Sequence, residues 1–224
     1  MRLGQVSANV AGRIDGLRHS GRALNPYATH VPILVSLARL LRIRSVLEFG
    51  SGRFSTIAFL DRSVFPQLEI LHSVEDDAAW RNEVLNLAGG DPRLYLELVE
   101  TPHEAAVQVS PEKYDLILID DSRSKEYRVK TIECIVGKKP QHAVLVIHDF
   151  EIPDYQSASR VHGFRAFHFR ALLPETGVVY ADSRLDSRVL RSLERSIRRW
   201  TPRIDPGDHK RWARLIGDDG QPKS

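Results

Sequence analysis

The sequence predicts an α/β protein built on a doubly wound, mostly parallel sheet. Strand-like and helix-like segments alternate at least five times along the chain, as this architecture requires. Two strand-like segments, 114–120 and 143–149, are almost continuously apolar, which is typical of strands covered by helices on both faces. In a third segment, SVLEFGSGRFST at 45–56, a short strand runs directly into a glycine-rich loop and a helix. Ligands of doubly wound sheets bind at such turns.

The first helix is expected over residues 29–42. Thr29 can cap it, Pro32 suits its first turn, and leucine and isoleucine recur behind them at helical spacing. Strands are then expected at 45–49, 68–75, 93–100, 114–120 and 143–149, with helices between them at 55–60, 77–89, 103–109 and 125–137. Because a helix separates each strand from the next, the strands are expected to run parallel.

Beyond the fifth strand the elements are less regular. The pattern predicts a helix at 161–173, a strand at 177–182 and a helix at 188–200. From Thr201 onward, prolines and glycines predict an irregular segment. The expected organisation is an N-terminal arm over 1–28, one domain over 29–200 and an irregular basic tail over 201–224.

The composition is that of an ordinary globular protein. The chain has 224 residues, of which 42% are apolar and 27% are charged. No apolar run approaches the ~18–20 residues that span a bilayer, and the first residues lack the apolar core of a secretory signal. The single cysteine, Cys134, fits a reducing compartment and a small buried side chain. We therefore expect a cytoplasmic protein without a membrane partner.

Basic residues gather towards the end of the sequence. The net charge is +3, and ten arginines and lysines occur between Arg184 and Arg214. A basic segment can bind nucleic acid or an acidic protein, or it can form a solvated helix face. No aromatic stacking pattern accompanies these residues, so a nucleic-acid partner is the weaker expectation.

The glycine loop and the acid before it indicate a cationic ligand. Gly50 and Gly52, with Ser51 between them, leave the backbone free to approach a ligand. A dinucleotide-binding loop needs a third glycine, but Ser55 stands at that position. Glu48 at the strand end would also repel a pyrophosphate. S-adenosylmethionine carries an ammonium and a sulfonium and no phosphate, so it fits this loop better.

A second acid is placed to bind a nucleoside. Glu75 ends the second strand, 23 residues after Gly52, where an acid can accept hydrogen bonds from ribose hydroxyls. The alternative is that Glu75 belongs only to the solvated start of the next helix. Glu48, Glu75 and the glycine loop together predict a site for S-adenosylmethionine.

Four chemically active residues end the fourth and fifth strands, namely Asp120, Asp121, His148 and Asp149. The carboxyl ends of these strands meet at one edge of the sheet, beside the expected methyl donor. His148 has a pKa suited to removing a proton from the methyl acceptor, and Asp149 could orient the ring or bind substrate. Alternatively, Asp120, His148 and Asp149 could ligate a metal that acidifies a hydroxyl. A purely structural role as loop caps is also open.

Three further histidines are weaker candidates. His30, at the start of the first helix, could close over the cofactor. His162 and His168 lie in an aromatic-rich stretch that is expected to pack or to line an acceptor pocket.

These segments resemble the class I S-adenosylmethionine-dependent methyltransferases. The resemblance covers roughly residues 30–150 and is carried by EFGSG (48–52), SVEDDAAW (73–80), YDLILIDD (114–121) and VLVIHDF (144–150). It implies a seven-stranded Rossmann-like sheet whose last strand is antiparallel, with GVVYAD and a weaker neighbour as the final hairpin.

The resemblance also assigns roles to residues of the site. It implies that Glu48, Gly50 and Gly52 hold the methionine end of the cofactor and that Glu75 binds its ribose. Ser51 and Asp120 are expected to lie beside the cofactor as well.

Within the class, the nearest resemblance is to the O-methyltransferases of the catechol and caffeoyl-CoA kind. Those enzymes bind a divalent cation through an aspartate after strand four and an Asp–Asn pair after strand five. Asp120 matches the first position, whereas His148 and Asp149 stand in place of the pair. Their lysine, three residues after the first aspartate, is replaced by Arg123, which cannot act as a base. A hard cation such as magnesium suits histidine poorly, so these departures argue against the metal-dependent mechanism, and a divalent cation is kept only as an alternative.

The function that these patterns predict is S-adenosylmethionine-dependent methyl transfer to a hydroxyl of a small molecule, with His148, Asp149 and Asp120 at the reacting centre. One alternative is methylation of RNA or protein, with the arginine-rich segment as a docking surface. Two others are a binding module without catalysis and a dinucleotide-dependent oxidoreductase. Homodimer formation is left open by the sequence.

Overall fold

The computed structural model describes residues 25–121, 124–180, 185–201 and 204–219. Most of the expected N-terminal arm, Arg123 and the last five residues of the expected tail lie outside these residues. The domain boundaries expected after residues 28 and 200 stay predictions.

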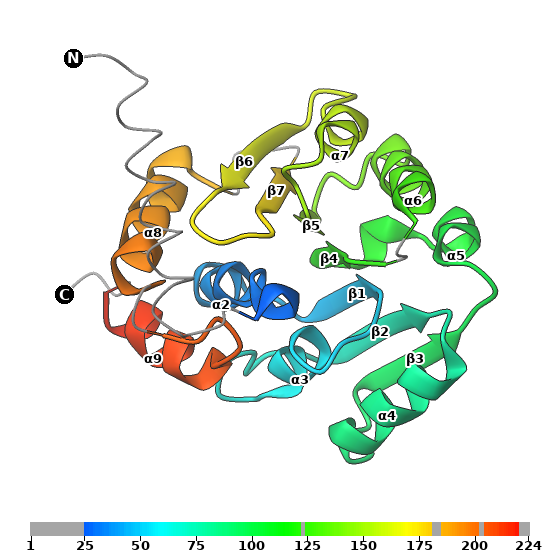
Figure 1. Cartoon of the computed structure of the whole chain (residues 1–224), viewed down its shortest axis with the longest axis horizontal. Helices are drawn as coiled ribbons and strands as arrows, with labels where there is room; N and C mark the ends of the chain where they lie inside the picture. Colours follow the sequence, from blue (N-terminus) through cyan, green and yellow to red (C-terminus); the bar gives the residue numbers. More distant parts are fainter. Residues whose placement is uncertain (1–24, 122–123, 181–184, 202–203, 220–224) are drawn as a thin grey trace.

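A seven-stranded sheet forms the centre of the protein, as predicted (Figure 1). Its strands are β1 (Ser45–Phe49), β2 (Ile70–Glu75), β3 (Leu94–Leu98), β4 (Leu116–Ile119), β5 (Val144–His148), β6 (Arg165–Phe169) and β7 (Thr176–Tyr180). Their order in the sheet is β3-β2-β1-β4-β5-β7-β6, in which β7 is antiparallel to both of its neighbours. This arrangement confirms the doubly wound sheet and its final antiparallel hairpin.

Helices cover both faces of the sheet. The structure has η1 (Pro26–Ala28), α2 (Val31–Leu40), α3 (Ser55–Leu60), α4 (Ala78–Ala88), α5 (Pro102–Gln108), η2 (Pro111–Lys113), α6 (Lys125–Gly137), α7 (Pro153–Ser159), α8 (Ser187–Trp200) and α9 (His209–Asp219). Helices α2, α3, α8 and α9 pack on one face, and α5, α6 and α7 pack on the other (Figure 1). Among the described residues, none of these helices is long and apolar enough to cross a membrane.

The core follows from the alternation of side chains along the central strands. In β4, Leu116 and Leu118 belong to the core beneath α2, whereas Ile117 and Ile119 belong to the core beneath α6. All residues of β4, β5 and β7 are buried, as expected for strands covered on both faces. The edge strands β3 and β6 are partly exposed. The carboxyl ends of β1, β4 and β5 therefore belong to strands that are packed into the core.

The prediction of a helix at 161–173 is wrong, because residues 165–169 form strand β6. Apolar residues in this stretch fit helical spacing as well as they fit a strand. The choice depends on β7, whose backbone pairs with β6 from Arg165 to Phe169. The weaker neighbour that the resemblance implied for GVVYAD is this strand. A long-range pairing therefore overrides the local pattern.

The prediction of an irregular tail is also wrong for residues 209–219, which form α9. Trp212 and Ile216 lie one turn apart and are both buried in the core shared with α2. The guanidinium of Arg39 donates to the Ala213 carbonyl oxygen at 3.2 Å, which joins the two helices. The spacing of Trp212, Leu215 and Ile216 indicates one apolar face of a helix. The flanking prolines and glycines favoured the prediction of an irregular segment instead.

Two smaller predictions also differ from the structure. The first long helix begins at Val31 rather than near Thr29, and the Thr29 hydroxyl does not cap it. A helix that the sequence pattern did not predict, α7, follows β5 and begins at Pro153, where proline suits a first helical position. Both differences bring side chains to the carboxyl edge of the sheet.

Candidate active site

The glycine loop lies at the point where the strand order reverses. From β1 the chain continues to β2 on one side, whereas β4 lies on the other side and leads to β5. Gly50 has a φ of +86°, and a Cβ there would lie 2.3 Å from the carbonyl oxygen of Asp120. The Asp120 N–H in turn donates to the Phe49 carbonyl oxygen at 2.9 Å. Only glycine fits this position, so the loop and the end of β4 touch directly at the switch point.

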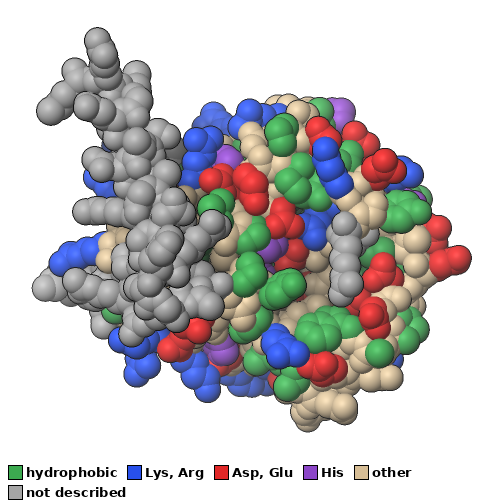
Figure 2. Space-filling view, in the orientation of Figure 1, with side chains coloured by type: hydrophobic (Ala, Val, Ile, Leu, Met, Phe, Trp, Pro, Cys, Tyr) green, Lys and Arg blue, Asp and Glu red, His purple; other side chains and the backbone are tan. Residues whose placement is uncertain are grey.

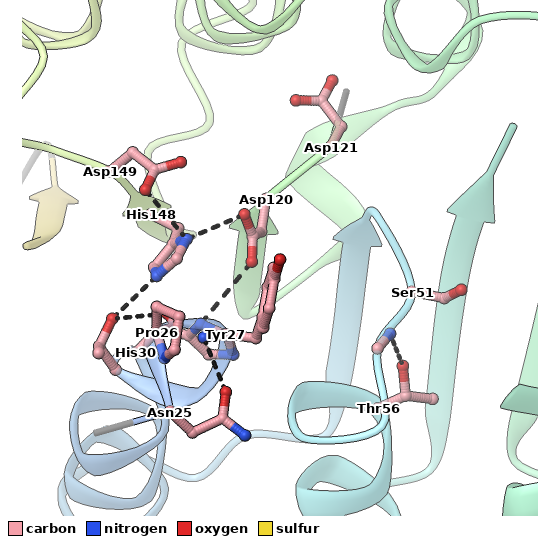
Figure 3. A network of polar contacts seen from close by, with 12 residues as sticks. Asn25, Pro26, Tyr27, His30, Ser51, Thr56, Asp120, Asp121, His148 and Asp149 are labelled. Atoms are coloured by element: carbon pink, nitrogen blue, oxygen red, sulfur yellow. Dashed lines mark hydrogen bonds and ion pairs between the residues drawn. The ribbon is translucent and has the colours of Figure 1, made fainter. Parts of the chain in front are cut away.

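Side chains from β2 and α4 hold the glycine loop in place. Glu75 Oε2 accepts hydrogen bonds from Ser51 N–H at 3.0 Å and Ser51 Oγ at 2.8 Å. The indole N–H of Trp80 donates to the Ser51 carbonyl oxygen at 2.7 Å. Figure 3 shows the loop leading from β1 towards Ser51 and Thr56, whose Oγ1 accepts from the Gly52 N–H at 2.9 Å. The loop is therefore shaped before any ligand binds.

Glu75 is buried at the end of β2, with 7% of its surface exposed. Its second oxygen, Oε1, accepts from the backbone N–H groups of Asp76 and Asp77, both at 3.1 Å. Burial raises the pKa of Glu75, although these hydrogen bonds oppose the shift. The structure thus places Glu75 against Ser51 in the glycine loop, and its contact with a ribose stays a prediction.

Glu48 is fully buried beneath the glycine loop. Its Oε2 accepts from Thr56 Oγ1 at 2.8 Å and from the Ser73 hydroxyl. Burial raises the pKa of Glu48 to about 7, although hydrogen bonds from Ser55, Ser73 and Thr56 oppose the shift. Glu48 therefore supports the first turn of α3, and its expected contact with a cofactor ammonium stays a prediction.

The buried carboxyl of Glu48 should make the stability of the folded protein fall as the pH rises. The unfolded chain ionises Glu48 near pH 4.5 and the folded chain only near pH 7, so ionisation in this window favours unfolding. Between these pH values the free energy of unfolding of the wild type should fall by an amount on the order of 3 kcal/mol because of Glu48, and we expect this fall to be absent in Glu48→Gln. Urea unfolding at several pH values measures it. The exposed Glu133→Gln variant should follow the wild type, and a Glu48→Gln profile parallel to the wild type would contradict the prediction.

His148 joins the ends of β4 and β5 to η1. Its Nδ1 lies 3.1 Å from Asp120 Oδ1 and 3.6 Å from Asp149 Oδ1. On the other side of the ring, Nε2 lies 2.9 Å from Thr29 Oγ1. The Thr29 hydroxyl also lies 3.4 Å from the Pro26 carbonyl oxygen, to which it can donate. The side chains that the sequence expected at two strand ends therefore meet, with Thr29 as an additional partner.

This arrangement favours the protonated form of His148. When both ring nitrogens carry protons, Nδ1 donates to Asp120 and Nε2 donates to Thr29, which can pass its own hydrogen to Pro26. Burial alone lowers the pKa of His148, but the charge and hydrogen bond of Asp120, together with Asp149, outweigh it and raise the pKa. Asp120 itself has a pKa of about 2, because His148 and Arg128 outweigh the effect of its burial. His148 is therefore a proton acceptor whose charged form is stabilised by its neighbours.

His30 lies inside this cluster beside Asp120, and its closure over the cofactor stays a prediction. Its ring packs edge-on against His148 with centroids 5.0 Å apart, and only 2% of its surface is exposed. Its Nδ1 is 3.8 Å from Asp120 Oδ2, and neither ring nitrogen has a hydrogen-bond partner among the described residues. Burial lowers the pKa of His30 to about 3, so its imidazole is neutral.

Arg128 is the main residue of the site that the sequence reasoning missed. Its NH1 lies 2.7 Å from Asp149 Oδ2, its NH2 3.2 Å from Asp120 Oδ1, and its Nε 3.3 Å from Asp121 Oδ1. The signal was available, because Arg128 precedes Ile132 by one turn on the buried face of α6. Asp149 meets it from a left-handed backbone conformation, φ +56°, which aspartate adopts more readily than most residues.

Carboxylates outnumber the guanidinium in this cluster. Asp120, Asp121 and Asp149 surround one arginine, which leaves negative charge even when His148 is protonated. Asp120 and Asp149 are the most accessible members, with 22% and 28% of their side chains exposed, whereas only 5% of His148 is exposed. Figure 2 shows acidic, basic and histidine side chains together near the middle of the face viewed in Figure 1. The edge that a ligand can reach is therefore acidic.

The predicted metal-ligand set does not fit a hard divalent cation. Of the expected ligands Asp120, His148 and Asp149, both aspartates already pair with Arg128, and His148 faces Asp120 through its Nδ1. A magnesium ion between them would lie beside a fixed positive charge. Among the described residues, only His30, Asp120 and His148 bring three ligand atoms within 4.8 Å of one another. That set is rich in nitrogen and would suit zinc better than magnesium.

His168, which was expected to pack or to line an acceptor pocket, lies on β6. Its ring packs edge-on against that of Phe150, with centroids 5.1 Å apart, so it has a packing role. His162 is exposed in the turn before β6. The structure brings neither residue into the cluster around His148.

No protein-family model and no curated protein matches this chain. Solved structures do resemble it. The cofactor-bound structure of Rv0187 from MTB superposes with a TM-score of 0.54 at 18% identity, over 78% of this chain and 88% of that one. An O-methyltransferase family protein from Burkholderia thailandensis gives 0.51 at 12% identity, over 66% and 54%. The SAH-bound methyltransferase PaMTH1 from Podospora anserina gives 0.51 at 11% identity, over 67% and 76%.

These likenesses establish the fold. The seven-stranded sheet of this chain shares its fold with these methyltransferases, in agreement with the resemblance of its sequence motifs. At such low identity the reaction has to be argued from the residues of the site.

Proposed function

We propose that this protein is an S-adenosylmethionine-dependent methyltransferase that transfers a methyl group to a hydroxyl of a small molecule. The observation that carries the proposal is the meeting of a glycine loop with an acidic cluster at the switch point of the sheet. This edge favours a ligand that carries positive charge and lacks phosphate. A neighbour of the same fold is bound to S-adenosylhomocysteine, the product of this cofactor.

In the proposed complex, the glycine loop and Glu75 hold the nucleoside part of the cofactor. All four lone pairs of the Glu75 carboxylate accept hydrogen bonds in the structure, so a ribose hydroxyl would take the place of the Ser51 hydroxyl on Oε2. The backbone of Asp120 lies directly against Gly50, so a carboxylate follows the loop closely and its negative charge would favour the sulfonium and ammonium groups. Bound S-adenosylmethionine supplies the electrophilic methyl carbon.

The residues of the cluster would position the acceptor and take its proton. The acceptor hydroxyl would approach the exposed edge at Asp120 and Asp149 and would give up its proton to the hydrogen-bonded pair of Asp120 and His148, where the protonated imidazole is stabilised. The methyl group of the bound cofactor would pass to the acceptor oxygen, so the products would be S-adenosylhomocysteine and a methyl ether. Thr29 accepts a hydrogen bond from the other ring nitrogen and so holds the ring in place. Alignment and proton removal are both provided by the chain itself.

A titration with S-adenosylhomocysteine tests the cofactor. Calorimetry of the full chain should show saturable binding of this compound, with NAD as the comparison ligand. Tighter binding of NAD, or no binding of S-adenosylhomocysteine, would remove the proposal. A screen of phenols, catechols and sugars for release of S-adenosylhomocysteine from S-adenosylmethionine then identifies the acceptor class.

Glu75→Gln should weaken the binding of S-adenosylhomocysteine by roughly 10- to 150-fold, because buried ribose hydroxyls lose a charged acceptor worth ~1.5–3 kcal/mol. Calorimetric dissociation constants measure the effect. Ser51→Ala removes only the hydroxyl that bonds Glu75 within the loop and should have a smaller effect. An equal loss in both variants would mean that Glu75 acts only by holding the loop, and unchanged affinity would remove its role.

A further inference from the structure

We propose that the guanidinium of Arg128 is the permanent counter-ion of the strand-end carboxylates, at the place where metal-dependent methyltransferases of this fold hold a divalent cation. The importance of Arg128 for methyl transfer rests on the proposed function, whereas its role as a counter-ion of the aspartates does not. The site would then work without magnesium.

The guanidinium contacts carboxylates from two neighbouring strands. Asp120 and Asp121 follow β4 and Asp149 follows β5, so Arg128 joins the ends of both strands at 2.7–3.3 Å. It also donates to the Asp121 backbone carbonyl oxygen. Arginine suits this position because its donors are fixed in a plane and point in several directions at once.

Four of the six carboxylate oxygens of the three aspartates lie within 3.3 Å of a polar group, and the other two face histidine rings at longer distances. Arg128 faces one oxygen of each, at the distances given above. Of the remaining oxygens, Asp121 Oδ2 accepts from Thr131 Oγ1 at 2.6 Å. Asp149 Oδ1 faces His148 at 3.6 Å and Asp120 Oδ2 faces His30 at 3.8 Å. A hard cation would have to displace these groups to obtain the six or more oxygen ligands it prefers.

The structure also holds Arg128 in place from behind. Only 7% of its side chain is exposed, and its guanidinium carbon lies 5.6 Å from the centre of the Tyr155 ring on α7. A side chain buried in this way cannot swing into solvent to make room for an ion. Arg128 is therefore a positioning residue, which holds Asp120 towards His148 and Asp149 towards the accessible edge.

The test converts the arginine site into a metal site. Arg128→Ala leaves three carboxylates facing the space that the guanidinium filled. We expect this variant to bind Mn²⁺ at about tenfold or greater affinity than the wild type, measured as loss of the free Mn²⁺ signal in electron paramagnetic resonance. Its melting temperature should be lower than that of the wild type in EDTA and should rise on addition of Mg²⁺ or Ca²⁺, whereas that of the wild type should not change.

Arg93→Ala is the matched control. Arg93 is equally buried but pairs with a single carboxylate, that of Asp91, at 2.6 Å. Its removal should destabilise the protein without creating a cation site, so divalent cations should not restore its melting temperature. A gain of Mn²⁺ binding in Arg128→Ala but not in Arg93→Ala supports the proposal. No gain in Arg128→Ala would overturn it.

Measurements on the wild type keep the proposal testable if Arg128→Ala does not fold. Stoichiometric binding of Mn²⁺ or Zn²⁺ to the wild type, lost in Asp120→Asn or His30→Ala, would show that the site holds a metal beside the arginine and would overturn the proposal. No binding by the wild type or by Arg128→Lys, which retains a cation, would support it. These readouts involve neither S-adenosylhomocysteine nor turnover, so they are independent of the proposed reaction.

Discussion

Gly50→Ala is expected to destabilise the protein by about 3–5 kcal/mol, a large part of the total stability of a typical domain. The new Cβ would lie 2.3 Å from the Asp120 carbonyl oxygen and 2.7 Å from its carbon. These atoms belong to the backbone at the end of β4, so no flexible side chain can move aside. The positive φ of +86° adds strain for any residue with a Cβ.

Gly89→Ala separates the two causes. Gly89 ends α4 with a φ of +62°, but a Cβ there meets no atom within 4 Å. The substitution should therefore cost only about 1 kcal/mol, from the backbone conformation alone. Urea unfolding followed by circular dichroism measures both variants. Equal losses would mean that the contact between the loop and Asp120 does not constrain Gly50.

His148→Gln is expected to lower the rate of methyl transfer by roughly 10²–10⁴-fold while leaving the affinity for S-adenosylhomocysteine unchanged. Glutamine retains hydrogen-bonding capacity but cannot take up a proton, so the variant removes the base and keeps the packing. Rates of S-adenosylhomocysteine formation with an acceptor found by the screen, together with calorimetry, measure the two effects. His142→Gln, at an exposed position before β5, is the matched control and should behave as the wild type.

The pH dependence of the rate gives a second readout of the same residue. A base must be unprotonated to act, so the wild-type rate should rise with pH, with a midpoint above the usual 6.5 because the pKa of His148 is raised. Asp120→Asn removes the charge that raises this pKa, so its midpoint should move to lower pH. If His148→Gln turned over as fast as the wild type, or if the midpoint did not shift in Asp120→Asn, His148 would be excluded as the base.

The regular part of the fold could be read from the sequence. Strands β1, β2, β4 and β5 and the glycine turn after β1 carry local signals, because burial on both faces and strand-to-loop transitions depend on adjacent residues. The same signals placed Asp120 and His148 at neighbouring strand ends, where the structure brings their side chains to 3.1 Å. Residues 165–169 had no such unambiguous signal, since their conformation depends on pairing with β7.

The sequence by itself determined the fold class, the switch point and the acids around it, since each of these follows from periodicity or from a position at the end of a strand. Only the tertiary structure decided which groups complete the site. Thr29 and His30 come from before α2, and Arg128 comes from α6, yet all three reach the strand ends. Contacts between side chains on separate elements depend on how helices pack across the sheet. No local pattern encodes that packing.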